Sequence, residues 1–393
     1  MKSPSPNPDS VGLLILLSAL VALGPLTIDM YLPALPAMST ALGASTSQVQ
    51  LTISSYLLGF SVFHLACGPL ADRYGRRPIL LGGLALYMLA SYACSLASSI
   101  EQLIVLRFIQ GVGACVGPTL GRAIARDVYG PQRAAQALAY IAMIMALAPA
   151  VAPALGSLLL EFFSWASIFA ALALYALAVL GFVAGKLPES LPQRQELSVT
   201  VVSRNYLELL RNGHYMATTC ASGLMYAGMI SFLSASSFIF IDMMGISTRY
   251  FGVLFLTTVA GYITGSGLST RLVHNRSSEQ VMWLGMTLAV AASLLQLLLT
   301  EAWFHVAAIL VPMAMFSTAL GIVLPHAMAS ALRPFPHMAA TASALFGFIQ
   351  MGLSSLGGAI VGYYLVNDAR PMVLVILACT MSAAYLCRRL QAP

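Results

Sequence analysis

The sequence contains few charged residues. Only 8% of its 393 residues are Asp, Glu, Lys or Arg, whereas soluble domains carry about 25%. Together with a hydrophobic share of 59%, this scarcity excludes an ordinary soluble enzyme, a disordered protein and a nucleic-acid binder with a basic face. A polytopic membrane protein remains. At about 20 apolar residues per spanning helix, the chain has room for roughly a dozen spans.

The sequence also lacks the local signals of catalysis and of metal binding. It contains no HExxH, P-loop, GxSxG or zinc-ligand spacing, so we expect no enzymatic activity, no cofactor and no metal site. Its six cysteines lie in apolar stretches without CxxC spacing, which indicates small buried side chains instead of disulfides. The first ten residues have no basic segment and no cleavage site, and they predict a short cytoplasmic tail instead of a signal peptide.

Long apolar runs predict an all-α membrane protein with twelve transmembrane helices. The runs are continuous instead of alternating in short segments, which argues against a β-barrel. The predicted spans are 11–35, 47–70, 78–97, 101–124, 134–159, 165–187, 214–240, 249–272, 280–300, 303–328, 337–365 and 371–388.

The basic residues predict the orientation of the chain. With the N-terminus inside, all of the 19 Lys and Arg except Arg107, Arg249 and Arg370 fall on the cytoplasmic side, as the positive-inside rule requires. A polar stretch then divides two similar bundles. The predicted organisation is a tail at 1–10, a six-helix bundle at 11–187, a linker at 188–213, a second six-helix bundle at 214–388 and a tail at 389–393.

The strongest local pattern is GPLADRYGRRP at 68–78, between the second and third spans. Glycine permits a tight turn, Asp72 is suited to accept hydrogen bonds from a helix N-terminus, and the arginines are suited to carboxylates or lipid phosphates. We expect a cytoplasmic latch, and the alternative is a basic stop signal alone. The residues concerned are Gly68, Asp72, Arg73, Gly75, Arg76 and Arg77.

This loop resembles the signature of the major facilitator superfamily. LGPLTIDMYLPALP at 23–36 is similar to the first helix of its bicyclomycin-resistance, or Bcr/CflA, group of drug–proton antiporters. RFIQGVG at 107–113 resembles the superfamily's fourth-helix motif, and FPHMAATASALFGF at 335–348 resembles the group's eleventh helix. The resemblance implies two pseudo-symmetric bundles and proton-coupled export of small amphipathic drugs across the bacterial inner membrane by a monomer.

The resemblance also implies two ion-pair sets and a hinge. Arg76–Asp127 and Asp72–Arg126 pairs would close the cytoplasmic side. In helix five, APAVAPALGS at 148–157 departs from the antiporter motif, because Ala148 and Ser157 stand where glycines are expected. The motif's other residues are kept, and they imply a hinge at Pro149, Pro153 and Gly156.

Asp29 and Arg107 are the two ionised residues that we place deep within spans. Such charges cost about 2.5–3.5 kcal/mol to insert and usually mark function. We expect them to lie at one depth and to meet across a central cavity, where burial favours the neutral carboxyl and arginine favours the ionised one. The alternative is a permanent structural salt bridge.

Other polar and aromatic residues in the spans predict a binding pocket. Aromatic residues would contact a hydrophobic substrate, although aromatics in spans are more often lipid-facing or core. We assign Gln110 to the cavity, and we expect helix–helix hydrogen bonds instead of a proton relay for His64, His326 and Gln350. The candidate aromatics are Tyr31, Tyr56, Tyr226, Phe232 and Phe238.

Three other functions are alternatives to this prediction. A metabolite exporter, for a sugar, a nucleoside or a siderophore, would use the same architecture. A membrane sensor would need a soluble output domain, and a membrane enzyme would need clustered His or carboxylates at one face; the sequence has neither.

Overall fold

The structure, a computed structural model, describes residues 11–191, 199–365 and 368–389. Within those ranges every regular element is a helix, and twelve helices are long and apolar enough to cross a membrane. The predicted all-α membrane fold with twelve spans is therefore confirmed.

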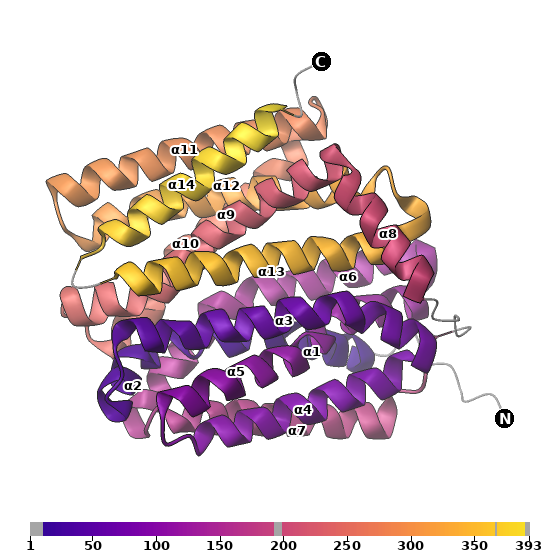
Figure 1. The fold of residues 1–393 in the computed structure, drawn as a ribbon, viewed down its shortest axis with the longest axis horizontal. Coiled ribbons are helices and arrows are strands. Elements are labelled where there is room, and N and C mark those ends of the chain that lie inside the picture. Colours follow the sequence, from indigo (N-terminus) through magenta and orange to yellow (C-terminus); the bar gives the residue numbers. More distant parts are fainter. Residues whose placement is uncertain (1–10, 192–198, 366–367, 390–393) are drawn as a thin grey trace.

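The first half of the chain forms one group of helices, at the bottom of Figure 1. Its helices pack mainly on one another, with α1 against α6, α3 against α5 and α4 against α7. Its elements are α1 (Val11–Asp29), η1 (Leu32–Ala34), α2 (Leu35–Leu42), α3 (Thr46–Tyr74), α4 (Arg76–Ser95), α5 (Ile100–Ala114), α6 (Val116–Phe162) and α7 (Ala166–Lys186).

The second half lies above the first in the same view and begins with a helix inside the predicted linker (Figure 1). This helix, α8, and the first group's α3–α4 turn lie at the right-hand end of the molecule, which we call the linker side. The elements are α8 (Val199–Arg211), α9 (Gly213–Ser237), the π-helical η2 (Phe238–Met243), α10 (Thr248–Leu272), α11 (Ser278–Ala302), α12 (Val306–Leu332), η3 (Pro336–Met338), α13 (Ala339–Tyr364) and α14 (Arg370–Arg389).

Short polar caps fix where several spans begin. Ser45 and Ser277 form capping boxes with the glutamine three residues later, at the starts of α3 and α11. Asn212 accepts a hydrogen bond from the amide of Tyr215 and starts α9. These side chains satisfy amides that have no partner within the helix, so the apolar runs begin at defined residues.

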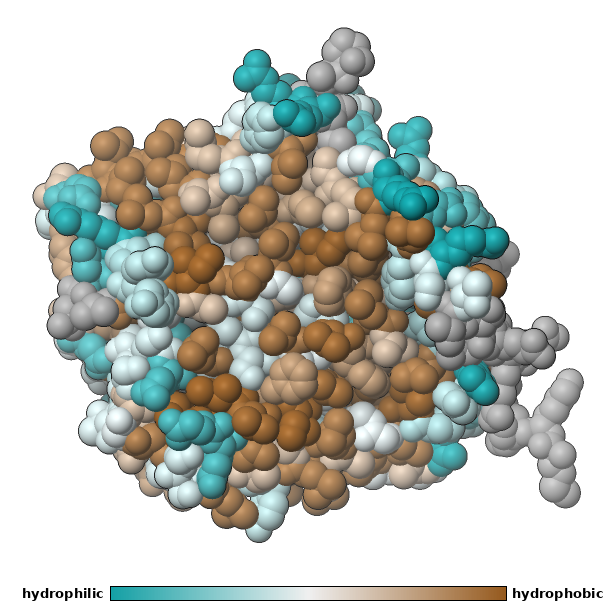
Figure 2. Space-filling view, in the orientation of Figure 1, coloured by the Kyte–Doolittle hydropathy of each residue, from teal (hydrophilic) through white to brown (hydrophobic). Residues whose placement is uncertain are grey.

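The outer surface of the molecule is suited to lipid. Figure 2 shows a broad apolar face with hydrophilic residues gathered toward the two ends of the helices. Large apolar side chains such as Leu174 and Leu298 are 67% exposed, which water would disfavour and lipid tolerates. The protein is therefore a multi-pass membrane protein.

The two groups meet along two helix pairs, α3 with α13 and α6 with α10. On the first pair, Ser61 donates to the carbonyl of Phe348 and Ser355 donates to the carbonyl of Ser54, both at 2.7 Å. The close approach depends on α13 glycines, since a Cβ at Gly347 would lie 2.5 Å from the His64 ring.

The structure differs from the predicted spans in two places. The first span does not end at residue 35, because the chain resumes as α2 after η1 and the span covers Val11–Leu42. The predicted linker contains α8, which we did not expect in a polar stretch. In both places the additional helices pack on neighbouring spans, η1 on α6, α2 on α3, and α8 on α9 and α13.

Candidate transport site

Asp29 occupies the point at which the first span is interrupted. It is the last residue of α1, and η1 follows it with Pro33 inside. The side chain is 5% exposed, and the described residues give it no hydrogen bond or ion pair. Tyr226 of α9 lies within electrostatic range of the carboxyl group. The acid therefore lies between the two groups of helices.

Arg107 lies inside the first group, in a cage of aromatic rings. Its guanidinium carbon is 4.5 Å from the ring centroids of both Tyr31 and Tyr56 and 5.7 Å from that of Phe169. The side chain is fully buried. Such cation–π contacts are worth about 2 kcal/mol each when water is excluded, so the rings hold a cation that forms no ion pair among the described residues.

The expected meeting of Asp29 and Arg107 is not present, because no ion pair joins them among the described residues. Asp29 is the last residue of α1, and Tyr31 lies in the turn before η1. Tyr31 faces Arg107 within the first group, and Asp29 faces α9. Their depths also differ from our estimate, since Asp29 is near the middle of the span Val11–Leu42.

Hydrogen bonds complete the Arg107 cage. Arg107 donates to Gln110 at 2.5 Å, and Gln110 donates to Ser91 at 2.8 Å. Gln110 is therefore engaged by its own bundle and holds the arginine; the structure does not place it on an open surface. Nε and Nη2 of Arg107 and the hydroxyl of Tyr56 are buried without hydrogen-bond partners.

The structure separates the aromatic candidates. Tyr31 and Tyr56 belong to the Arg107 cage, and Tyr226 lies near Asp29. Phe232 is 1% exposed and packs on Phe240 and Phe255 within the second group.

Phe238 is also buried in the second group, at 3% exposure. The ring contacts of Phe232 and the burial of Phe238 therefore support the core alternative for both residues.

Two of the three polar residues form the expected contacts between helices. His326 hydrogen-bonds Ser269 at 2.9 Å, and Gln350 donates to Ser222 at 3.5 Å. The His64 ring packs on Phe60 of its own helix and lies against Gly347 of α13, with its Nδ1 buried and without a hydrogen-bond partner.

The loop at 68–78 folds as a latch around Arg76. This arginine bridges Asp72 at 2.7 Å and Asp127 at 3.1 Å, so that it joins the end of α3 to α6. The predicted Arg76–Asp127 pair is present. The predicted Asp72–Arg126 pair is wrong, because Asp72 lies one turn before Arg76 and pairs with it.

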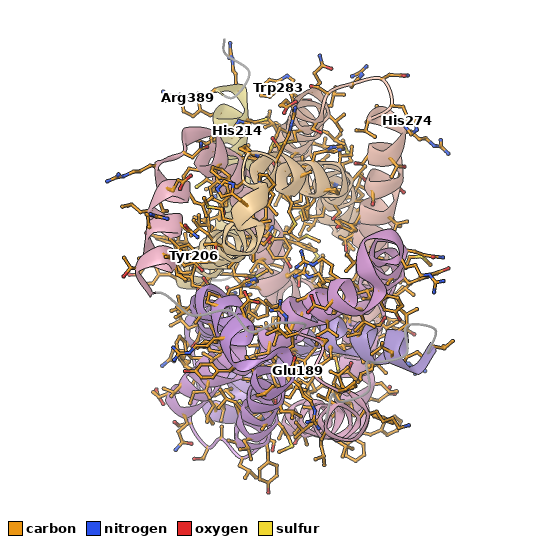
Figure 3. The ribbon with its side chains drawn as sticks, turned by 90° about the vertical axis from the view of Figure 1, so that its right-hand side faces the viewer. Glu189, Tyr206, His214, His274, Trp283 and Arg389 are labelled. Atoms are coloured by element: carbon orange, nitrogen blue, oxygen red, sulfur yellow. The ribbon has the colours of Figure 1, made fainter. Side chains whose placement is uncertain are left out.

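Glu189 completes the latch, and the sequence analysis missed it. Its carboxylate accepts hydrogen bonds from the backbone amides of Arg76 at 2.9 Å and Arg77 at 3.2 Å, at the start of α4. This was the role expected for Asp72, and a carboxylate at a helix N-terminus is favourable. Figure 3 places Glu189 at the linker side of the first group. Its position just after the sixth span was the available signal.

Of the remaining residues at 68–78, Gly75 is required for the turn between α3 and α4, and the others lie within those two helices. Gly75 has φ +107°, and a Cβ there would lie 2.4 Å from Glu189, so glycine is needed. Gly68 lies within α3 with open space around it, which corrects the expectation that it forms the turn. Arg77 donates to the carbonyl of Ala184, and Arg73 stacks on the neighbouring Tyr74.

The fifth predicted span, which forms the second part of α6, remains helical through its prolines. Within α6 the one residue with non-helical backbone is Gly130, at φ 65°, so no bend at Pro149 or Pro153 is visible. A Cβ at Gly156 would lie 2.1 Å from the carbonyl of Met30. The hinge therefore stays a prediction, and Gly156 has a packing role next to the interruption of the first span.

Comparison with known proteins decides the family. The sequence profile of the Major Facilitator Superfamily matches residues 17–359. The chain belongs to this superfamily. Its fold agrees, since a crystal structure of the nucleoside transporter NupG superposes with a TM-score of 0.75 at 13% identity and covers 96% of this chain and 98% of its own.

Two curated relatives confirm the resemblance to the bicyclomycin-resistance group. The chloramphenicol resistance protein of Pseudomonas aeruginosa is 32% identical over 92% of this chain and 87% of its own length. The bicyclomycin resistance protein homolog of Haemophilus influenzae (strain ATCC 51907 / DSM 11121 / KW20 / Rd) is 27% identical over 94% of this chain and 93% of its own.

Proposed function

We propose that this superfamily member is a proton-coupled exporter of small amphipathic drugs in the bacterial inner membrane. Relatives named for chloramphenicol and bicyclomycin resistance support the cargo class. The concentration of Lys and Arg at the linker side supports a cytoplasmic location for that side and for both termini. A proton crossing 100 mV supplies about 2.3 kcal/mol, which is enough to sustain a useful gradient of a small compound.

The observation that carries the proposal is the position of Asp29. An intramembrane carboxyl group without a partner is expensive and marks ion pathways. Here it lies where the first group meets Tyr226 of the second, so that a rocking motion changes its surroundings. Asp29 takes a proton from the outer side and releases it to the cytoplasm, and the outgoing drug competes for the same space.

Arg107 acts on this site through its neighbours. The guanidinium holds Tyr31, whose hydroxyl hydrogen-bonds Thr52 at 2.5 Å. Tyr31 is two residues from Asp29 and follows the end of α1, so the cage fixes the backbone that presents the acid. Arg107 is therefore a positioning residue for the proton site, and Tyr226, within electrostatic range of the acid, is the aromatic residue that we expect to contact the drug.

The two groups, 11–187 and 214–388, move as units about the α3–α13 and α6–α10 contacts. Arg249 and Glu161, 3.9 Å apart, join α10 to α6 on the side opposite the linker. The Arg76 latch strengthens the linker side of the first group. Each exposed pair is worth about 0–1 kcal/mol, and a few kcal/mol suffices to select between two conformations.

The test is drug accumulation in inside-out membrane vesicles with an imposed acid-inside pH gradient. Asp29→Asn preserves size and polarity but cannot exchange a proton, so we expect gradient-driven chloramphenicol accumulation to fall to background with normal expression. Asp242→Asn is the matched control, since Asp242 is an exposed acid of the second group, and it should retain activity. Accumulation by Asp29→Asn equal to that of the parent would disprove the assignment.

A further inference from the structure

Helix α8 exposes apolar and basic side chains together. Leu207 is 47% exposed and Leu210 is 49% exposed. Arg204 and Arg211 are exposed beside them, and neither has a hydrogen bond or ion pair among the described residues. An exposed leucine pair next to two unpaired arginines is poorly suited to open water, although such a surface is typical of helices that lie at a membrane surface.

The four residues share one side of the helix. Positions 204, 207 and 211 follow the spacing of three and four residues that places side chains in one stripe, and Leu210 lies beside that stripe. A shallow groove of about 310 Å3 runs along it, lined by Arg204, Leu207, Glu208, Arg211 and Asn212. One carboxylate among two guanidiniums leaves the groove positive.

The opposite side of α8 is fixed to both groups of helices. Leu209 is fully buried in a cluster with Tyr215 and Phe335 of the second group. Tyr206 donates to the carbonyl of Leu65 in α3 at 2.8 Å. Burial raises the pKa of Tyr206 to about 12, so the hydroxyl remains a donor at physiological pH.

The position of α8 leaves the stripe facing outward. Asn212 alone separates it from α9, which is a span. In Figure 1 the helix lies at the right-hand end of the molecule, and in Figure 3, which faces the linker side, Tyr206 lies at the edge between the two groups. In a membrane, a helix at the end of the spans and at the edge of the bundle would lie near the lipid headgroups.

We propose that the outer stripe of α8 binds the headgroups of anionic phospholipids, with Arg204 and Arg211 on the phosphates and Leu207 and Leu210 among the upper acyl chains. Guanidinium is well matched to phosphate, and basic residues near an anionic leaflet add about 1 kcal/mol each. Bound lipid then stabilises α8 against α3 and thereby the contact between the two groups. The orientation of the protein decides which leaflet supplies the lipid, and lipid binding at this stripe does not require the transported drug.

The experiment titrates purified protein in neutral detergent micelles with phosphatidylglycerol and follows the thermal unfolding midpoint. The parent should be stabilised by phosphatidylglycerol and unaffected by phosphatidylcholine. In the Arg204→Gln/Arg211→Gln variant, the phosphatidylglycerol needed for half-maximal stabilisation should rise about fivefold for each arginine removed, or about 25-fold in total.

The control is Arg271→Gln/Arg276→Gln, which removes two exposed arginines from the same side of the second group and should titrate like the parent. Arg204→Lys/Arg211→Lys keeps the charge and should retain most of the response even if the glutamine variant folds poorly. An equal loss in the control variant, an unresponsive parent, or equal stabilisation by inorganic phosphate would each overturn the proposal. These outcomes are independent of drug transport.

Discussion

Two loops at equivalent positions in the two halves differ in their electrostatics. After α3, Arg76 lies between two carboxylates and Glu189 caps the next helix. In GLSTRLVHNRS at 267–277, at the end of α10, the contacts are hydrogen bonds: Ser269 bonds His326 of α12 at 2.9 Å, and His274 bonds the carbonyl of Thr270 at 2.8 Å. The two connections therefore occupy similar places in the fold, and only the first is built as a latch.

The interiors of the two groups of helices also differ in their charged residues. The first group encloses a cation among aromatic rings at Arg107. The second encloses no buried Lys or Arg among the described residues; it holds rings, with Phe232 5.9 Å from Phe255 and 6.3 Å from Phe240, and polar side chains such as His326. The buried charged side chains among the described residues, Asp29 and Arg107, thus both lie in the first half. This difference supports our proposal that the first half carries the proton coupling.

The largest expected contrast between the halves comes from truncating these cores. Arg107→Ala should reduce gradient-driven efflux by about tenfold or more, because the cation that holds Tyr31 is lost, and the protein should remain folded. Phe232→Ala should instead lower stability by about 3–5 kcal/mol. Efflux assays measure the loss of transport, and size-exclusion chromatography with thermal melting measures the loss of folded protein, so the two effects can be separated. If Arg107→Ala chiefly lost folded protein, the arginine would be a structural element instead.

A smaller contrast concerns the glycines of the two loops. Gly75→Ala places a side chain at φ +107° and against Glu189, so we expect strain of about 1–2 kcal/mol and a severalfold fall in transport. Gly68→Ala and Gly267→Ala add a methyl group in open space within helices and should be neutral or slightly stabilising. Thermal melting together with efflux distinguishes them. A tolerated Gly75→Ala would remove the case for a rigid latch.

The smallest contrast compares two helix starts. Ser277→Ala removes the cap of α11 and should lower stability by about 1 kcal/mol without changing transport, because the cap is local to one helix. Glu189→Ala should destabilise by a similar amount and also reduce transport, because it releases the α4 start from the segment after α7. Thermal melting measures the loss of stability and efflux assays measure the loss of transport in each variant, so together they distinguish a local cap from a latch residue. Equal transport in both variants would make Glu189 an ordinary cap.

The sequence predicted what depends on composition and short-range pattern. Twelve spans, the family and the Arg76–Asp127 pair follow from hydropathy and motif. It failed where partners come from distant segments, as when Glu189 caps α4 instead of Asp72. The estimate that Asp29 and Arg107 lie at one depth was also wrong, because η1 interrupts the first span and Asp29 faces away from Arg107. Helix α8 was missed because its apolar residues are too few for a span.

The central claim is that Asp29 carries the proton that the drug displaces. Drug-induced proton release from purified protein in weakly buffered detergent, followed with a pH indicator, tests it most directly, with chloramphenicol and a panel of amphipathic compounds as ligands. We predict release from the parent and from Asp242→Asn and none from Asp29→Asn. Undiminished release from Asp29→Asn would show that another group carries the proton.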